Sequence, residues 1–233
     1  MAERPVFVPV PETEDLVREV YFPMKWHPGF APTQKEKNIR TLHEAAAAAG
    51  LSPLLEVSTK SENKRGRHLS AFHIKIKTAS REIPLECAFQ GSKVFAHGGP
   101  FTDLYDKDVR AAKRDPRLTG SGALRGFMFD DFLWPLEPKT AFYDWLYIDF
   151  LKDWREWGQK LCAYAGFTDI EFNPYRSVNC QARSCALFVS LMKRELLDEA
   201  AKSPSDFIRV LSMSNYRPHL RAAETPLFSN SKS

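Results

Sequence analysis

Residues 85–95 constrain the fold of this chain more than any other stretch, and they read L-E-C-A-F-Q-G-S-K-V-F. In a helix, Glu86, Gln90 and Lys93 stand at positions i, i+4 and i+7 and project from one face. The other residues are nearly all apolar and would bury most of the helix surface. We therefore predict that the polar stripe lines a crevice suited to a polar, anionic ligand. The alternative is a solvated helix face with a partly buried salt bridge.

Composition and residue spacing exclude several classes of protein. The 233 residues are 43% hydrophobic and 27% charged, which is enough for one domain with a full core. The net charge of +4 is compatible with binding to a polyanion but too small to show that the protein binds one. The cysteines show no C-x-x-C spacing and the histidines no H-x-x-x-H spacing, so we expect reduced thiols and no metal site. With neither a signal peptide nor a run of 18 apolar residues, we expect a cytoplasmic protein with no membrane contact.

The pattern of apolar residues predicts a predominantly helical α+β domain with a small β-sheet. We expect an N-terminal arm and helix over residues 1–50, the catalytic domain over residues 51–215 and a polar tail over residues 216–233. Strands are predicted at 54–58 and 70–77, a turn at 81–84, and helices at 33–49, 103–114, 138–164 and 178–201. Within the arm, a short edge strand should precede about a turn of helix at 13–20, and Thr33 should cap the next helix.

A hydrophilic segment separates the two predicted strands of the catalytic domain. Residues 59–68 read T-K-S-E-N-K-R-G-R-H. Most such charge runs are only solvated. This one leads directly toward the predicted 85–95 helix, so it is well placed to meet phosphates or a nucleic-acid backbone through Lys60, Lys64, Arg65 and Arg67.

A second polar segment covers residues 167–179, F-T-D-I-E-F-N-P-Y-R-S-V-N, between two predicted helices. It contains Asp169 and Asn179, and Asn179 shares a helix face with Arg183 if the helix begins near residue 178. A helix N-terminus is a natural phosphate site. The alternative is a loop held by its own hydrogen bonds.

Several segments together resemble the NADAR family, which is named for a predicted link to NAD and ADP-ribose. Residues 66–72 resemble its G-x-L-S-N-F element, and residues 85–95 resemble its V-E-H-x-x-Q-x-x-K-F helix. Trp134 with Lys139 is similar to its W-x-x-x-K element, and residues 169–172 followed by Asn179 resemble D-x-x-W-G…N-x-x-G. The resemblance covers residues 54–197 in order. This sequence departs from the pattern at Ala71, Cys87 and Phe172, which replace Asn, His and Trp. In addition, Trp134 lies one residue further from its lysine than in the pattern, and the glycine after Asn179 is not matched cleanly.

The departures and the extra N-terminal arm resemble the subfamily of antitoxins that are paired with DarT-type toxins, which attach ADP-ribose to guanine in DNA. The resemblance implies a hydrolase that removes ADP-ribose from the guanine amino group without a cofactor. Its substrate would be ADP-ribosylated DNA, in the single-stranded form, and a DarT-type toxin is the candidate protein partner.

Cleavage of an N-glycosidic bond needs stabilisation of an oxocarbenium-like sugar and a positioned water. We assign this work to Glu86, with Asp169 as the second carboxylate. Gln90 and Asn179 would bind the sugar, while Lys93, Arg183 and Lys60 would face the diphosphate. A Schiff-base role for Lys93 stays open. The further expected contacts are Ser70 at the substrate, a stacking ring from Trp134 or Phe172, and Lys64, Arg65 and Arg67 at the DNA backbone.

Two other functions are compatible with the sequence. An N-glycosidase could act on a small phosphoribosyl intermediate, as proposed for riboflavin-pathway relatives, although it would have less use for the basic segment and the arm. A non-catalytic module could bind NAD-like ligands or neutralise a toxin by contact. This module would keep its full activity after Glu86→Gln, whereas the hydrolase would lose turnover.

Overall fold

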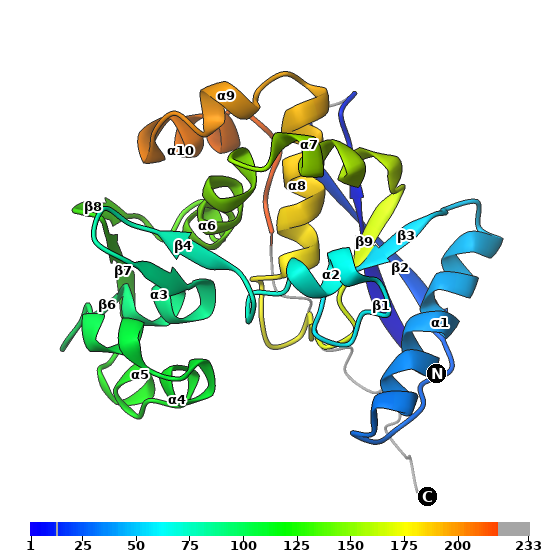
Figure 1. Ribbon diagram of the computed structural model, residues 1–233, viewed down its shortest axis with the longest axis horizontal. Helices are drawn as coiled ribbons and strands as arrows, with labels where there is room; N and C mark the ends of the chain where they lie inside the picture. Colours follow the sequence, from blue (N-terminus) through cyan, green and yellow to red (C-terminus); the bar gives the residue numbers. More distant parts are fainter. Residues whose placement is uncertain (13, 219–233) are drawn as a thin grey trace, which may run out of the picture.

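A buried helix, α8 (Gln181–Lys193), runs through the middle of the computed structural model, which describes residues 1–12 and 14–218 (Figure 1). Every residue from Ala182 to Leu191 is buried. A helix that is apolar on nearly all sides is stable only when other elements surround it. Here a four-stranded sheet lies on one side of α8, and α6 (Ala141–Lys152) with the remaining strands lies on the other.

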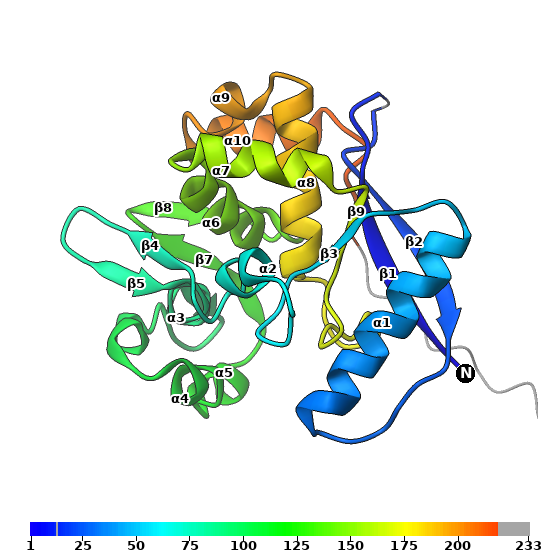
Figure 2. The ribbon, with the colours of Figure 1, turned by 45° about the vertical axis from the view of Figure 1, so that its right-hand side comes forward.

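The four-stranded sheet has the order β2-β1-β9-β3. Strands β1 (Ala2–Pro9) and β2 (Val17–Met24) form an antiparallel hairpin, and β1 also pairs with β9 (Gly166–Thr168), with Phe7 opposite Phe167. Strand β3 (Leu54–Glu56) runs parallel to β9. Helix α1 (Pro32–Ala48) covers this sheet through Ile39, Leu42 and Ala46 (Figure 2).

The first 50 residues correct two predictions. Residues 17–20 form strand rather than helix, because all of β2 pairs with β1; residue 13 lies outside the described residues. Thr33 does not cap α1, since the helix begins one residue earlier at Pro32 with Ala31 at the N-cap position and no side-chain hydrogen bond. A proline in the first turn loses no intrahelical bond, and its fixed φ favours this start.

The other group of strands surrounds α3 (Leu85–Gly91), which the sequence predicted. The hairpin of β4 (Lys75–Lys77) and β5 (Glu82–Pro84) leads into α3. Two predictions are corrected here: residues 82–84 of the predicted turn form strand β5, and residues 70–73 of the predicted strand form a turn. A second sheet has the order β6-β7-β8. Its strands are β6 (Lys93–Phe95), β7 (Leu124–Phe129) and β8 (Phe132–Trp134).

The predicted long helices are broken into shorter pieces. Residues 102–120 form the 3₁₀ helix η1 (Thr102–Asp106), α4 (Val109–Lys113) and α5 (Arg117–Gly120). Helix α6 is followed by α7 (Arg155–Gln159) and η2 (Lys160–Ala163), and α8 by α9 (Leu197–Ala200) and α10 (Pro204–Ser212). The short helix α2 (Lys64–His68) interrupts the basic segment. Helices with small sheets confirm the predicted α+β class.

A buried carboxylate holds the last described residues on the core. Asp144 of α6 accepts hydrogen bonds from the hydroxyls of Thr140, of Ser184 at 2.6 Å and of Tyr216 at 2.9 Å. Burial raises the pKa of Asp144, and the three donors oppose that effect. Tyr216 is itself 3% exposed, so it joins the end of the described chain to α6 and α8. The rest of the predicted polar tail, residues 219–233, lies outside the described residues.

Tyr216→Phe should lower the free energy of unfolding by about 1–2 kcal/mol, because it removes a hydrogen-bond donor from a buried carboxylate while keeping the ring. Urea denaturation followed by circular dichroism measures the change. Phe30→Leu, at a side chain that is 97% exposed, is the surface control and should change stability by less than about 0.5 kcal/mol. Equal stability of the Tyr216 variant and the wild type would contradict the assignment.

Candidate active site

A cleft of about 570 Å³ opens where α3 and β6 face the segment that precedes α8. This volume lies within the range of small-molecule sites. One wall carries Glu86, Gln90 and Lys93, the polar stripe that the sequence predicted. The remaining lining residues are Phe89, Lys113, Leu124, Phe127, Leu136, Glu137, Lys139, Tyr143, Ser177, Val178 and Asn179.

The polar stripe is a continuous chain of hydrogen bonds. Lys93 Nζ donates to Gln90 Oε1 at 2.6 Å, and Gln90 Nε2 donates to Glu86 Oε1 at 2.8 Å. Helix α3 ends at Gly91, where a Cβ atom would lie 2.5 Å from the ring of Tyr105, so this close approach requires glycine. Lys93 therefore lies on β6 rather than on the predicted last helical turn. The strand continues along the same wall of the cleft, which keeps the three side chains together.

Two lysines lie close to one carboxylate in this wall. Glu86 is 5% exposed, and Lys113 Nζ of α4 lies 3.5 Å from its Oε1 atom. Burial lowers the pKa of Lys93, opposed by the charge of Glu86 and reinforced by that of Lys113. The sequence analysis did not identify Lys113. It stands 27 residues after Glu86 in a segment with no recognisable motif, and only the path through η1 and α4 brings it to the cleft.

The rest of the cleft lining offers polar groups of a different kind. Among the described residues, Asn179 Oδ1 is buried and has no hydrogen-bond partner. A buried acceptor without a donor is costly unless a ligand supplies one. Tyr143 is also buried, and burial followed by the charge of Glu86 raises its pKa well above the usual range, so its hydroxyl keeps the proton. The cleft thus presents two carboxylates, of Glu86 and Glu137, together with two amides, three amines and a phenol.

The structure does not bring Asp169 to this cleft. Asp169 Oδ1 accepts the backbone N–H groups of Glu171 at 3.0 Å and Phe172 at 3.2 Å, and Oδ2 accepts Gln181 Nε2 at 2.9 Å. Burial, reinforced by nearby Glu56, raises the pKa of Asp169 to about 8. These contacts are those of a residue that holds its own loop on α8.

Three further predicted site residues lie in the core. Arg183 is 2% exposed and forms an ion pair with Glu19 of β2. It does not share a helix face with Asn179, because α8 begins at Gln181 and Asn179 precedes the helix. Phe172 packs edge-on against Phe7. Trp134 is 1% exposed and packs against aromatic residues of α6 and α10, namely Phe142, Trp145 and Phe207. The structure therefore leaves neither predicted stacking ring at the cleft.

The basic segment lies beyond the cleft. The Arg67 guanidinium donates to the backbone carbonyls of Ser61 and Glu62, and Arg65 donates to the Tyr164 hydroxyl, while the Lys64 side chain is exposed. Neither Lys60 nor this segment lines the cleft. The buried Ser70 instead belongs to the turn that follows α2, where its hydroxyl accepts the backbone N–H of Phe72.

Two features of the described part of the chain bear on its class. None of the described helices has the length and apolar character needed to cross a membrane. No group of three or more histidine, cysteine, aspartate or glutamate side chains in residues 1–12 and 14–218 is arranged to hold a metal ion.

An α+β domain with a carboxylate, an amide and a lysine along one cleft wall has the features of a NADAR domain. The family model of the DarT1-associated NADAR antitoxin matches residues 2–220. The chain therefore belongs to the DarT1-associated NADAR antitoxin family, as the motifs of the sequence predicted, and this membership supports an antitoxin role toward a DarT toxin. No curated protein gives a significant match to the sequence.

The raised pKa of Asp169 predicts how stability depends on pH. An unfolded aspartate titrates near 3.8, so between that pH and about 8 the folded state holds a proton that the unfolded state has lost. The free energy of unfolding should therefore fall, by about 1–3 kcal/mol, as the pH rises from about 5 to about 8. Asp169→Asn should reduce this slope, leaving the share that buried Glu56 contributes. Urea denaturation across the pH range tests this, and equal slopes would contradict it.

Proposed function

We propose that the protein is an ADP-ribosyl glycohydrolase that removes ADP-ribose from guanine bases of DNA and so reverses the modification made by a DarT-type toxin. Membership of the antitoxin family supports the biological role. The observation that carries the chemistry is the hydrogen-bonded row of Lys93, Gln90 and Glu86 in the cleft wall. It places a shielded carboxylate beside an amine with a lowered pKa.

The reaction breaks the bond between C1″ of the ribose and the exocyclic nitrogen of guanine. The electron pair leaves with the nitrogen, and the oxygen of a water molecule joins C1″. Glu86 takes one proton from that water, and this proton ends on the guanine amino group while the other stays on the new hydroxyl. Before the water attacks, the same carboxylate stabilises the positive charge that develops on the sugar.

The lysines that line the cleft supply positive charge for the two phosphates of ADP-ribose. ADP-ribose carries two phosphate charges, and the cleft offers Lys113 and Lys139 near its mouth in addition to Lys93. Lys113 contacts Glu86 in the free protein and can exchange that contact for a phosphate oxygen. Gln90 fixes the orientation of Glu86, and the free acceptor of Asn179 suits a ribose hydroxyl. Together these groups favour an anionic nucleotide sugar over a neutral ligand.

Glu86→Gln should reduce ADP-ribose release from guanine-modified single-stranded DNA by about 10²–10⁴-fold, because the amide can neither accept the water's proton nor stabilise the cation equally well. Glutamine has the same shape, so the fold should persist in circular dichroism. Glu82→Gln on β5, whose carboxylate is exposed, is the matched control and should release ADP-ribose at the wild-type rate.

Thymine-modified DNA serves as the substrate control and should not be cleaved. Equal turnover by wild type and Glu86→Gln would contradict the role of Glu86. If the wild type released nothing from either DNA, the small phosphoribosyl substrate would become the next one to assay. The binding module would follow if that substrate also failed.

The alternative route is attack by Lys93, whose pKa is lowered by burial, because a neutral amine can attack an anomeric carbon. Such an attack would join Nζ to C1″ and expel guanine, whose amino nitrogen takes the proton that the amine loses, and opening of the sugar ring would give an imine that water hydrolyses. On this route borohydride would reduce the imine and leave an ADP-ribose adduct on residue 93, detectable by mass spectrometry of tryptic peptides. Lys139→Arg is the control and should give the same adduct. Turnover without any adduct would leave direct attack by water as the route.

A further inference from the structure

We propose that Phe72 and the basic face of α4 form a docking surface for single-stranded DNA, in which the Phe72 ring stacks on a base next to the modified guanine. This inference rests on the proposed function for its modified substrate. Its structural basis is separate, because Phe72 does not line the cleft. Phe72 lies four residues after the segment that the sequence predicted to contact DNA, and the His73 ring contacts the Arg67 carbonyl of that segment.

Phe72 is an exposed ring on a firmly held backbone. Its side chain is 39% exposed, whereas its neighbours Ser70 and Ala71 are buried. Gln181 Oε1 accepts the backbone N–H of Ala71 at 2.9 Å, and the Tyr147 hydroxyl donates to the Leu69 carbonyl at 3.1 Å. These buried contacts fix the turn that carries the ring. An exposed aromatic ring in a fixed position is a platform on which any unpaired base can stack.

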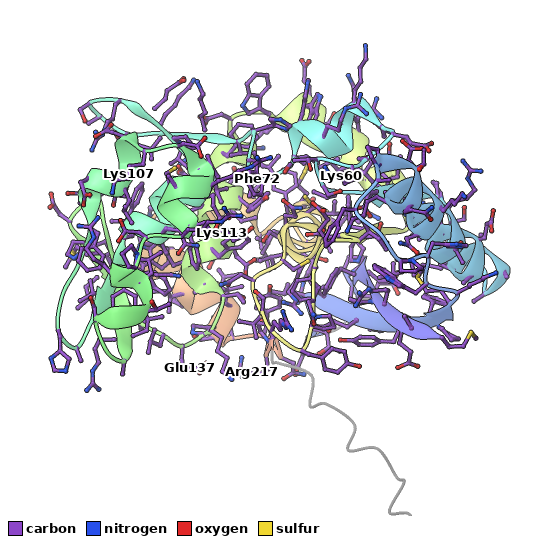
Figure 3. All side chains as sticks on the ribbon, turned by 90° about the horizontal axis from the view of Figure 1, so that it is seen from below. Lys60, Phe72, Lys107, Lys113, Glu137 and Arg217 are labelled. Atoms are coloured by element: carbon purple, nitrogen blue, oxygen red, sulfur yellow. The ribbon has the colours of Figure 1, made fainter. Side chains whose placement is uncertain are left out.

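Lys113 connects this ring to the proposed catalytic centre. Its Nζ atom lies 5.8 Å from the centroid of the Phe72 ring and 3.5 Å from Glu86 Oε1. Phe72 and Lys113 lie together near the middle of one face of the molecule, with Lys60 further along this face and Glu137 at its opposite edge (Figure 3). A base stacked on Phe72 would therefore lie next to a guanine whose ADP-ribose enters the cleft.

The cations of α4 supply the contacts to the DNA backbone. Arg110 and Lys113 stand at i and i+3, so they share one side of the helix, and Arg114 follows directly at the C-cap position; all three are exposed. Within the described residues, no ion pair or side-chain hydrogen bond engages the guanidinium of Arg110 or Arg114. The nearby carboxylates of Asp103, Asp106 and Asp115 are each neutralised by an ion pair with Arg117, Arg81 or Lys107. The carboxylate of Asp108, which caps α4, accepts the backbone N–H groups of Arg110 and Ala111 rather than a guanidinium. The two arginines are thus available to phosphates.

The ring and the charges together favour a single strand over a duplex. Stacking on Phe72 needs a base with a free face, which a base-paired stack does not offer. Regularly spaced cations alone would bind either form of DNA. The combination of an exposed ring, adjacent unpaired arginines and a cleft deep enough for the sugar fits an unpaired strand that passes over the cleft mouth.

The test is the binding of an unmodified, fluorescently labelled single-stranded oligonucleotide, measured by anisotropy. Phe72→Ala should raise the dissociation constant by about tenfold, whereas Phe72→Trp should restore or strengthen binding. Phe30→Ala removes a ring that is 97% exposed on another segment and should bind as the wild type does. The Arg110→Gln, Arg114→Gln double variant should lower the salt slope by about 1.4, at about 0.7 for each phosphate contact, and Lys37→Gln on α1 should leave it unchanged.

Activity separates this inference from the proposed function. If the wild type hydrolyses ADP-ribosylated oligonucleotide and Phe72→Ala binds and cleaves it as well as the wild type does, the docking surface is overturned while the proposed function stands. If no ADP-ribose is released but Phe72→Ala loses affinity for the oligonucleotide, the docking surface is supported and the hydrolase is not. Equal effects of Phe72→Ala and Phe30→Ala on the dissociation constant would also overturn the docking surface. Thermal melts check that each variant is folded.

Discussion

The side chain of Gln181, the first residue of α8, joins three segments that are far apart in the sequence. Its Nε2 atom donates to Asp169 and its Oε1 atom accepts the backbone N–H of Ala71, while the Tyr147 hydroxyl, which donates to the Leu69 carbonyl, lies 3.4 Å from the same Oε1 atom. One amide at the start of α8 therefore holds the 169–172 loop, the turn before β4 and helix α6 in fixed relation. Because each of these contacts is buried or partly buried, the loss of any one would leave a polar group without its partner.

This junction also explains how the chain tolerates departures from the family pattern. Ala71 contributes its backbone N–H rather than a side chain, so the contact with Gln181 does not depend on the residue type. Cys87 is fully buried, and its thiol donates to the Lys107 carbonyl. Burial raises the pKa of Cys87 to about 11, which keeps the thiol neutral. Neither departure changes the row of polar side chains along the cleft.

The sequence predicted the parts of the site that depend on local pattern. Glu86 and Gln90 lie four residues apart in a short apolar helix, and that spacing alone determines that they share a face. The position of Lys113 could not be predicted, since it depends on packing between α3 and α4. The shared face expected for Asn179 and Arg183 failed because helix α8 starts after Asn179. Aromatic residues such as Trp134 suit a core and a stacking site equally well, so only the packing distinguishes the two.

The pairing of β1 with β9 has a consequence for the synthesis of the protein. Phe7 lies opposite Phe167, so β1 is synthesised about 160 residues before β9, with which it pairs. The β1–β2 hairpin can form early, but a two-stranded hairpin alone is marginally stable. Tyr216, which completes the hydrogen bonds of Asp144, is made later still. The native core is therefore complete only after Tyr216 has been translated.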